Sequence, residues 1–470
     1  MLAAPMTQAE NLSVDQAKDA AAHFLQHNTT LTRVTADQLT LAHQWNNETL
    51  GVPSMYLFAA PSEGWIVMAA TTAIDPVVAY SDENAYDGRM APQQQWWLEG
   101  CSEYVSAVQA LDAEKPLGDS PEWTALANHA LKGGTKASVT LMKTKWDQGG
   151  PQGNDYNMFS PVINDSVAPT GCVATALAQI CKYYEYPKQP KGRVSYRNDR
   201  DGGTQMAINF DTVAPLDYSL MPNEIRFSTT QERRVEVSRL DYYVGMSVKM
   251  QFGPALSGSQ DDWAVSGMKT NMKYTRGTLV ERRFTNDTAY LNAVRRELLM
   301  NRPVYMSGVS SSGGGAHAGG HAWVCDGYKE EDSSMYHMNW GWGGTGNAFY
   351  NLRTNSLQIN GQPYNFSRQQ SVITGMIPPQ DSTAIQVGVV EVENVAELGR
   401  PYPNPATLSV TLPYSTREAA DLTVYSVSGR MVTSQRVQAG EGEVTLRVDA
   451  LPSGIYIYRL GDAHGKFVVR

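Results

Sequence analysis

The sequence predicts a mixed α+β protein built from several domains. Its 470 residues exceed the roughly 250 to 300 residues that one hydrophobic core organises, so about three domains are expected. Helical and strand patterns are mixed up to about residue 379, whereas only short alternating strands follow. We therefore expect an N-terminal domain over residues 1–136, a central domain over 137–379, and a linker with a C-terminal domain over 380–470.

Composition excludes several classes of protein. Hydrophobic residues make up 42% of the chain and charged residues 18%, which suits a folded protein with sizeable cores. A net charge of -9 gives no electrostatic reason to bind nucleic acid. No apolar run approaches the roughly 20 residues of a membrane-spanning helix. The four cysteines show no close pair spacing, so we expect neither a disulfide framework nor a zinc site.

The N-terminal domain combines helices with a small sheet. Residues 11–28 predict a helix that begins at Ser13, a favourable N-cap, and presents one apolar face. Short apolar stretches broken by Pro, Gly and Asn predict an antiparallel sheet over residues 39–80. A helix follows over 92–111. Another begins at Ser120, because a capping serine precedes a first-position proline and an acidic first turn.

The central and C-terminal parts differ in pattern. The central part is rich in Gly, Tyr and Trp, with helices expected from Cys172, near Gln231 and near Asp287. Regular short strands with Gly and Pro turns predict a β-sandwich of immunoglobulin-like size at the C-terminal end. Its expected strands are 408–412, 421–425, 443–448 and 454–460.

Cys172 is the candidate nucleophile. It follows Pro169-Thr170-Gly171, a turn that runs directly into an amphipathic helix. The partial positive charge of first-turn amides favours a thiolate, which is the nucleophilic form of cysteine. Cys181 faces the opposite side of the helix, at about 100° per residue. The alternative is a buried structural thiol, the commonest fate of a free cysteine, and the other candidate residues argue against it.

His321 is the candidate general base. It lies between a glycine-rich loop over residues 310–320 and an apolar strand over 322–325. A neutral imidazole there can deprotonate the thiol, or form a thiolate–imidazolium pair, and later protonate the leaving amine. His317 is a rival, but the glycines around it predict a mobile flap. The same glycines argue against a helical His-x-x-x-His metal site, so we expect neither a metal nor a cofactor.

Three further residues complete the candidate site. Asn339 can accept a hydrogen bond from the histidine, and Trp340 can shield that bond from water. The alternative is that this segment is an aromatic turn without a catalytic role. Gln148 offers a side-chain N–H that could hold a developing oxyanion together with the backbone N–H of Cys172. A cysteine, a histidine and an asparagine in this chain order are the parts of a cysteine peptidase.

The middle of the chain resembles the streptopain family of cysteine peptidases. The match rests on Trp146-Asp147-Gln148, Gly171-Cys172-Val173-Ala174-Thr175-Ala176, Gly320-His321-Ala322 and Asn339-Trp340-Gly341-Trp342. The resemblance implies a papain-like catalytic domain with Cys172 as nucleophile and His321 as base. It also implies Gln148 in the oxyanion hole, with Asn339 and Trp340 supporting the histidine. The residues around Cys172 depart from the Cys-Gly-Ser-Cys-Trp pattern of papain, which is a poorer match.

The N-terminal domain resembles the propeptide of the same family. The match rests on the leading helix from Ser13, on Gly64–Ala70 and on Val77–Asp82. The resemblance implies an inhibitory prodomain that packs on the catalytic domain and disturbs the histidine until proteolysis removes it. We expect the cut between Lys132 and Lys145, after Lys136, where the chain is polar and rich in glycine.

The last 75 or so residues resemble the C-terminal sorting domain of the type IX secretion system of Bacteroidetes. The match rests on Pro401–Pro405, Val424–Arg430, Leu451–Tyr458 and Lys466–Arg470. The resemblance implies export from a Gram-negative cell, with the secretion machinery as a partner and an extracellular or cell-surface location. The first six residues are too short for a secretory signal, so we expect that a signal peptide is missing from this sequence.

We therefore predict a secreted cysteine endopeptidase made as an inactive precursor. Its substrates would be proteins and peptides, and its own prodomain would be its inhibitor. The resemblance implies a hydrophobic residue at the second position before the scissile bond. Two alternatives are a non-catalytic surface adhesin or binding protein on the same fold, and a transglutaminase-like acyl transferase. Retention of Cys172, His321, Asn339 and Gln148 argues against the adhesin.

Overall fold

The structure, a computed structural model, divides into two compact units, residues 1–379 and 380–470, which are described separately. No helix among the described residues is both long and apolar enough to cross a membrane. The described residues are 8–61, 63–127, 138–150, 153–282, 287–309, 320–329, 334–353, 358–359, 362–363, 370–379, 396–398, 401–416, 419–426, 431–438, 440–460 and 463–470.

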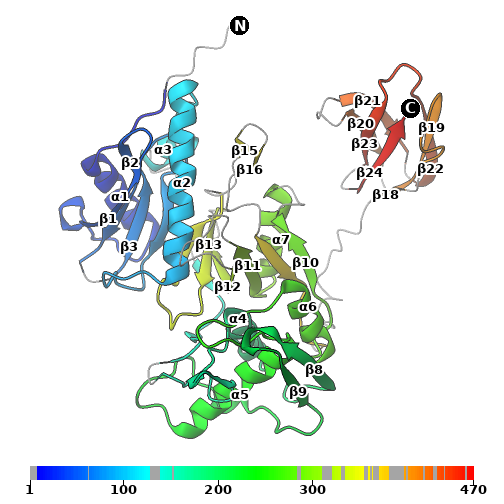
Figure 1. Cartoon of the computed structure of the whole chain (residues 1–470). Coiled ribbons are helices and arrows are strands. Elements are labelled where there is room, and N and C mark those ends of the chain that lie inside the picture. Colours follow the sequence, from blue (N-terminus) through cyan, green and yellow to red (C-terminus); the bar gives the residue numbers. More distant parts are fainter. Residues whose placement is uncertain are drawn as a thin grey trace. The chain divides into compact units, whose positions relative to one another are not determined.

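The N-terminal part of the first unit is an antiparallel sheet between helices, as predicted. Helix α1 (Val14–Asn28) begins at Ser13, which exchanges hydrogen bonds with Gln16 in a capping box. Alternate strand residues pack against α1 on one face and against helix α2 on the other, because side chains alternate along a strand (Figure 1). The elements are β1 (Thr40–Asn47), β2 (Val52–Ala59), β3 (Trp65–Ala69), β4 (Val77–Ser81), α2 (Pro92–Glu114) and α3 (Pro121–Ala127).

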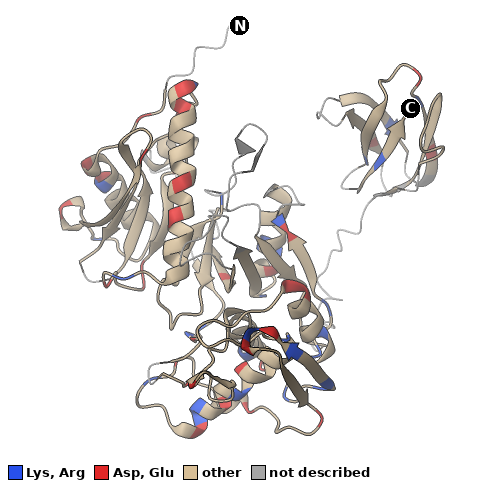
Figure 2. Ribbon diagram, in the orientation of Figure 1, with Lys and Arg blue, Asp and Glu red and all other residues tan. Residues whose placement is uncertain are grey.

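Helix α2 has an apolar inner face and acidic residues on its outer side. Trp97, Val105 and Val108 are fully buried in a core shared with the sheet. The ribbon of this helix carries red but no blue segments in Figure 2, since its sequence contains Asp and Glu but no Lys or Arg. Glu99 and Glu103 are at least partly exposed. The helix therefore belongs to the surface on one side and to the core on the other.

One sheet runs through both the N-terminal and the central parts. Its strand order is β1-β2-β3-β4-β14-β13-β12-β11-β17-β10. The joint is the pairing of β4 with β14 (Ala348–Asn351), in which Tyr80 lies opposite Phe349 and Ala79 opposite Tyr350. The two parts therefore fold as one compact unit. The predicted boundary between residues 136 and 137 lies outside the described residues and stays a prediction.

The central part places helices on both faces of this sheet. Helix α4 (Cys172–Tyr184) packs against β12 (Gly320–Lys329), and α5 (Gln231–Ser247) packs against α4. Helix α7 (Asp287–Leu299) shares a core with α2 on the other face. The sequence did not predict α6. The remaining elements near the site are α6 (Asp261–Thr270), β5 (Ser138–Thr140), β10 (Thr278–Glu281), β11 (Val304–Val309), β13 (Met335–Asn339) and β17 (Ser371–Thr374).

The second unit is a β-sandwich, as predicted. One sheet has the order β18-β19-β22 and the other β21-β20-β23-β24. Inward-facing residues of both sheets, among them Val410, Leu412, Val424 and Phe467, form its core. The strands are β18 (Ala396–Leu398), β19 (Ser409–Thr416), β20 (Ala420–Ser426), β21 (Met431–Val437), β22 (Gly440–Arg447), β23 (Gly454–Leu460) and β24 (Ala463–Val469).

Candidate active site

Cys172 begins helix α4, as the sequence predicts. Its N-cap, Gly171, has a φ of 89°, in the left-handed region that favours glycine. A Cβ on Gly171 would lie 2.7 Å from the sulfur of Met250 and 3.0 Å from the carbonyl oxygen of Ser257. A larger residue therefore could not take this turn without displacing its neighbours. The turn holds the thiol of Cys172 at the helix start with 8% of the residue exposed.

The thiol is not activated in this structure. Burial raises the pKa of Cys172 above its ordinary value. Hydrogen bonds from backbone N–H groups, first that of Ala322 and then those of Val173 and Cys172, lower the pKa but do not offset burial. The first-turn amides thus lower the pKa of Cys172, as the sequence predicts, but burial raises it by more. Cys172 is a protonated thiol at neutral pH.

His321 lies near the start of β12, and its side chain packs near tryptophans of the core that contains α2. Side chains alternate along the strand, so Ala322 packs in the core that contains Cys172, whereas Trp323 packs in the core that contains α2. The ring of His321 stacks near three tryptophan rings on this second face. Their centroid distances from the imidazole are 6.2 Å for Trp323, 6.3 Å for Trp340 and 6.3 Å for Trp342.

A backbone carbonyl holds the His321 ring. Nε2–H of His321 donates a hydrogen bond to the carbonyl oxygen of Trp340 at 2.9 Å. This bond fixes the proton on Nε2 and leaves Nδ1 as the accepting nitrogen of the neutral ring. Burial lowers the pKa of His321 to about 4, and the bond to Trp340 raises it only in part. The imidazole is therefore neutral at neutral pH.

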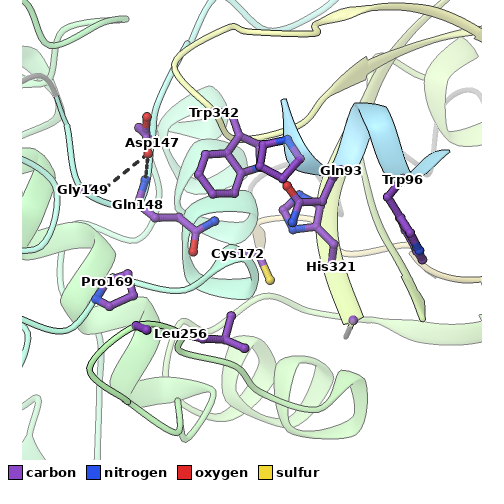
Figure 3. A pocket seen from close by; sticks show the side chains of 13 residues that line it. Gln93, Trp96, Asp147, Gln148, Gly149, Pro169, Cys172, Leu256, His321 and Trp342 are labelled. Carbon is purple, nitrogen blue, oxygen red and sulfur yellow. Dashed lines mark hydrogen bonds between the residues drawn. The ribbon is translucent and has the colours of Figure 1, made fainter. Parts of the chain in front are cut away.

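Cys172 and His321 line one cavity of about 440 Å³. Figure 3 shows the sulfur pointing away from the imidazole ring across this cavity. Among the residues that the structure describes, no hydrogen bond joins Sγ of Cys172 to His321. Gln93 and Trp96, near the start of α2, line the same cavity. Residues of the N-terminal part thus line the cavity that holds the candidate nucleophile and the candidate base.

Gln148 lies in this cavity as well. Its side chain points toward the side of the cavity that holds Cys172 (Figure 3). The carbonyl oxygen of Gln148 accepts hydrogen bonds from the backbone N–H and the hydroxyl of Thr170, at 3.1 and 3.0 Å. These bonds tie the segment to the turn that precedes Cys172. The adjacent Asp147 accepts a hydrogen bond from the backbone N–H of Gln148, and burial raises the pKa of this carboxyl.

The side chain of Asn339 forms no hydrogen bond to the imidazole of His321 within the part of the chain that the structure describes. Its side-chain NH2 donates to the carbonyl oxygen of Thr144 at 2.7 Å and to Oε1 of Gln179 at 3.1 Å. Its Oδ1 accepts from the backbone N–H of Gly341 at 3.2 Å. The sequence suggests that Asn339 accepts a hydrogen bond from His321. In the structure, the main-chain carbonyl of the next residue, Trp340, accepts it. Asn339 instead anchors the turn that carries this carbonyl.

The main-chain carbonyl of Trp340 accepts the hydrogen bond from His321, and its indole packs in the core. The indole is fully buried, with ring centroids 5.0 Å from Trp323 and 5.8 Å from Trp97 of α2. Its ring centroid lies 6.3 Å from that of His321, and the role of shielding the histidine from water stays a prediction. The second tryptophan of the motif, Trp342, lines the cavity itself.

Only some of the other residues that line the cavity could be expected from the sequence. Trp342 belongs to the aromatic motif that follows Asn339, and this motif pointed to the region without assigning Trp342 a role. Gln93 and Trp96 carry no such signal, because they reach the cavity only through the packing of α2 against the shared sheet. The candidate rival His317 and the expected cut after Lys136 lie outside the described residues.

Comparison with family models divides the chain into three matched segments. Residues 146–350 match the Peptidase C10 family, residues 9–105 match the Spi protease inhibitor family, and residues 400–470 match a secretion-system C-terminal sorting domain. Cys172, His321, Gln148, Asn339 and Trp340 all fall inside the peptidase match, whereas Gln93 and Trp96 fall inside the inhibitor match.

Individual relatives and one solved structure are similar to most of the chain. The chain is 29% identical over 394 residues to the thiol protease/hemagglutinin PrtT of Porphyromonas gingivalis, covering 80% of this chain but 43% of that protein. It is 26% identical over 408 residues to streptopain of Streptococcus pyogenes, covering 80% of this chain and 95% of streptopain. A prointerpain A fragment of Prevotella intermedia has a similar fold, with a TM-score of 0.56 and 23% identity, covering 72% of this chain and 98% of the fragment.

Proposed function

Since the chain carries a peptidase C10 domain, of the streptopain family, behind an inhibitor domain and before a sorting domain, we propose that it is an exported cysteine endopeptidase made as an inactive precursor. Cys172 is the nucleophile and His321 is the general base. The observation that carries the proposal is the single cavity that Cys172, His321 and Gln148 share with Gln93 and Trp96 of the inhibitor segment. The sorting domain directs the protein to the outside of the cell or to its surface.

The precursor is inactive because thiol and imidazole are kept apart. His321 stacks near tryptophan rings on the face that α2 covers, while the Cys172 thiol lies in the core on the other face. Removal of the N-terminal segment takes away α2 and with it Gln93 and Trp96. The imidazole, which already lines the cavity, can then turn and present Nδ1 to the thiol. Its Nε2–H bond to the Trp340 carbonyl selects the tautomer that this step requires.

In the first chemical step, Nδ1 of His321 takes the proton of Cys172 and the thiolate attacks the carbonyl carbon of the scissile peptide bond. The carbonyl oxygen becomes an oxyanion, which the side-chain amide of Gln148 and the backbone N–H of Cys172 stabilise. One such donor typically lowers the barrier by roughly 3 kcal/mol. The tetrahedral intermediate collapses when the imidazolium protonates the leaving amine, and an acyl-enzyme forms on the sulfur.

In the second step, water replaces the amine. His321 takes a proton from the water as it attacks the thioester, and the sulfur leaves as a thiolate that the imidazolium can reprotonate. Trp340 and Trp342 keep bulk water away from the ring. Asn339 keeps the turn of Trp340 in place through its hydrogen bonds to Thr144 and Gln179. Asn339 and Trp340 are thus positioning residues.

The substrates are proteins and peptides of the extracellular space, and resemblance to the family favours a hydrophobic residue at the second position before the scissile bond. The type IX secretion machinery is the partner that the sorting domain engages. The activating cut falls in the segment between the two matched regions, near Lys136.

A thiol-directed peptide epoxide tests the nucleophile. The chain is incubated with it before and after removal of the residues upstream of about Ala137, and the labelled residue is identified by mass spectrometry. We expect labelling of Cys172 only in the processed protein. Cys172→Ala abolishes it, whereas Cys181→Ala, a fully buried cysteine of the same helix, retains it. Labelling of processed Cys172→Ala by the same probe removes Cys172 from this role.

Product analysis separates hydrolysis from acyl transfer. The processed protein is supplied with a peptide substrate and an excess of a primary amine, and the acyl products are identified by mass spectrometry. Hydrolysis yields the free carboxylic acid, whereas a transglutaminase-like enzyme yields mainly the amide. Absence of both products in the processed wild-type protein would favour a binding protein on the same fold.

A further inference from the structure

A second cavity, of about 630 Å³, adjoins the candidate nucleophile. Cys172 and His321 line it, as they line the first cavity. Leu256 and Trp263 contribute apolar surface, and Asp261, the first residue of α6, contributes a carboxylate. A substrate side chain near the scissile bond would enter this space. Its lining therefore determines which side chains are accepted.

Strand β11 holds the Asp261 carboxylate. The hydroxyl of Tyr305 donates to Oδ1 of Asp261 at 2.9 Å, and the hydroxyl of Ser307 donates to Oδ2 at 2.7 Å. Tyr305 is fully buried, so its hydroxyl has a fixed position. Two donors, one on each oxygen, therefore orient the carboxylate. A carboxylate held in this way is better defined than one on a free surface side chain.

The same strand places Asp261 close to the nucleophile. Ser307 lies opposite Ala322 in the antiparallel pair of β11 and β12, and opposed residues share a face of the sheet. The backbone N–H of Ala322 donates to the sulfur of Cys172. The carboxylate is thus hydrogen-bonded to Ser307 and the sulfur to Ala322, and these two residues lie side by side on one face of the sheet.

The Asp261 carboxylate has acceptor capacity to spare. A carboxylate offers about four lone-pair sites, and the two hydroxyls use two of them. Within the described part of the chain, Asp261 forms no ion pair, although exposed charges lie at the rim of the cavity. There Oδ1 of Asp199 lies 3.7 Å from Nε of Arg197. The guanidinium of Arg200 donates to the carbonyl oxygen of Leu256 at 3.3 Å. Among the described residues, no cation pairs with the Asp261 carboxylate, so its free lone pairs are open to a cation of the substrate.

On the basis of the proposed peptidase function, we propose that Asp261 is a specificity-determining residue that binds the cationic end of a substrate arginine or lysine next to the scissile bond. The aliphatic stem of such a side chain packs on Leu256 and Trp263 while its charge reaches the carboxylate. Arginine is preferred to lysine, because its planar fork can use the remaining lone pair of each oxygen. This selection adds to the hydrophobic preference expected from the family.

Peptides that differ at one position at a time test the proposal. The processed enzyme is assayed with one parent peptide in which each of the three positions on either side of the scissile bond carries Arg, Lys, Leu or Glu. At one position we expect kcat/KM to be higher for Arg than for Glu, with a difference that shrinks as salt rises. In Asp261→Asn the Arg-to-Leu ratio at that position falls on the order of tenfold.

Asp262→Asn is the matched control, because Asp262 is the exposed neighbour on the same helix and is not among the residues that line the cavity. It keeps the wild-type ratios. Because the ratio compares two peptides on one protein, partial misfolding of Asp261→Asn does not alter it. An Arg-to-Leu ratio that is the same in wild type and Asp261→Asn at every position overturns the role of Asp261. Failure of the processed wild-type enzyme to cleave any peptide overturns the proposed function as well.

Discussion

Nε2 of His321 donates to the main-chain carbonyl of Trp340 at 2.9 Å and not to a side-chain amide. A carbonyl oxygen is only an acceptor, so the bond fixes one tautomer of the neutral ring and leaves Nδ1 for the thiol. In the proposed mechanism, this is the tautomer whose Nδ1 takes the proton of the thiol. In the part of the chain that the structure describes, no hydrogen bond joins Nδ1 to the sulfur of Cys172, although both side chains line the same cavity.

The reactivity of Cys172 should depend on pH differently before and after processing. Burial raises the thiol pKa and lowers the pKa of His321 to about 4, so in the precursor both groups are neutral from about pH 5 to about pH 8. Alkylation of Cys172 by iodoacetamide should then be slow and should accelerate only above the ordinary thiol range. In the processed enzyme an ion pair should keep alkylation fast at mildly acidic pH. Equal pH profiles for the two forms would contradict this explanation of latency.

Trp96→Ala should make Cys172 of the uncut chain more reactive. Trp96 is buried against the mouth of the site, and a Cβ on Gly308 of β11 would lie 3.6 Å from its ring. Truncation of a buried tryptophan typically costs about 3–5 kcal/mol of packing, so α2 should open more often. We expect the peptide epoxide to label Cys172 of the uncut variant at least about tenfold faster than wild type. Gln95→Ala, an exposed neighbour on α2, should label at the wild-type rate.

His337→Gln should flatten the pH dependence of stability near neutrality. Nδ1 of His337 lies 2.6 Å from Oδ1 of Asp326. Burial alone lowers the pKa of His337, but the charge and hydrogen bond of Asp326, with smaller effects of Glu83 and Asp82, raise it overall. A raised folded-state pKa stabilises the fold fully below the unfolded value, near 6.5, and this stabilisation is lost as pH rises through the folded value.

Differential scanning calorimetry of the full chain between about pH 5 and about pH 9 checks this prediction. The difference in melting temperature between wild type and His337→Gln should be largest at the acidic end and should shrink toward the alkaline end. His43→Gln is the matched control, because His43 is exposed on β1. A difference that grows with pH would show that protonation of His337 does not stabilise the fold.

Gly171→Ala should be more damaging than Gly202→Ala. Both glycines have a positive φ, 89° for Gly171 and 92° for Gly202, but ψ is 140° at Gly171 and 7° at Gly202, so only Gly202 lies in the left-handed helical well that an alanine can enter. Only at Gly171 does a Cβ meet other atoms, those of Met250 and Ser257, whereas nothing lies within 4 Å at Gly202. Overpacking should cost Gly171→Ala about 1–3 kcal/mol more in unfolding free energy. Urea denaturation measures this difference, and equal losses would exclude the close contact.

Local patterns in the sequence predicted much of the fold. The N-cap at Ser13, the helix beginning at Cys172 and the alternating strands of the C-terminal sandwich are confirmed, because each depends on residues that are near neighbours in the chain. Helix α6 was missed. The cysteine-peptidase class is confirmed by the Peptidase C10 match. The catalytic roles of individual residues and the domain boundaries stay predictions.

The sequence by itself determined which chemical groups are present: a thiol at a helix start, a histidine at a strand entry and an aromatic turn. Only the tertiary structure decided how they are disposed, because the β4–β14 pairing and the packing of α2 join segments that lie far apart in the chain. That joint brings Gln93 and Trp96 into the cavity and covers the face on which His321 lies. Burial between the packed layers then sets the pKa values of Cys172 and His321, a property that no local pattern encodes.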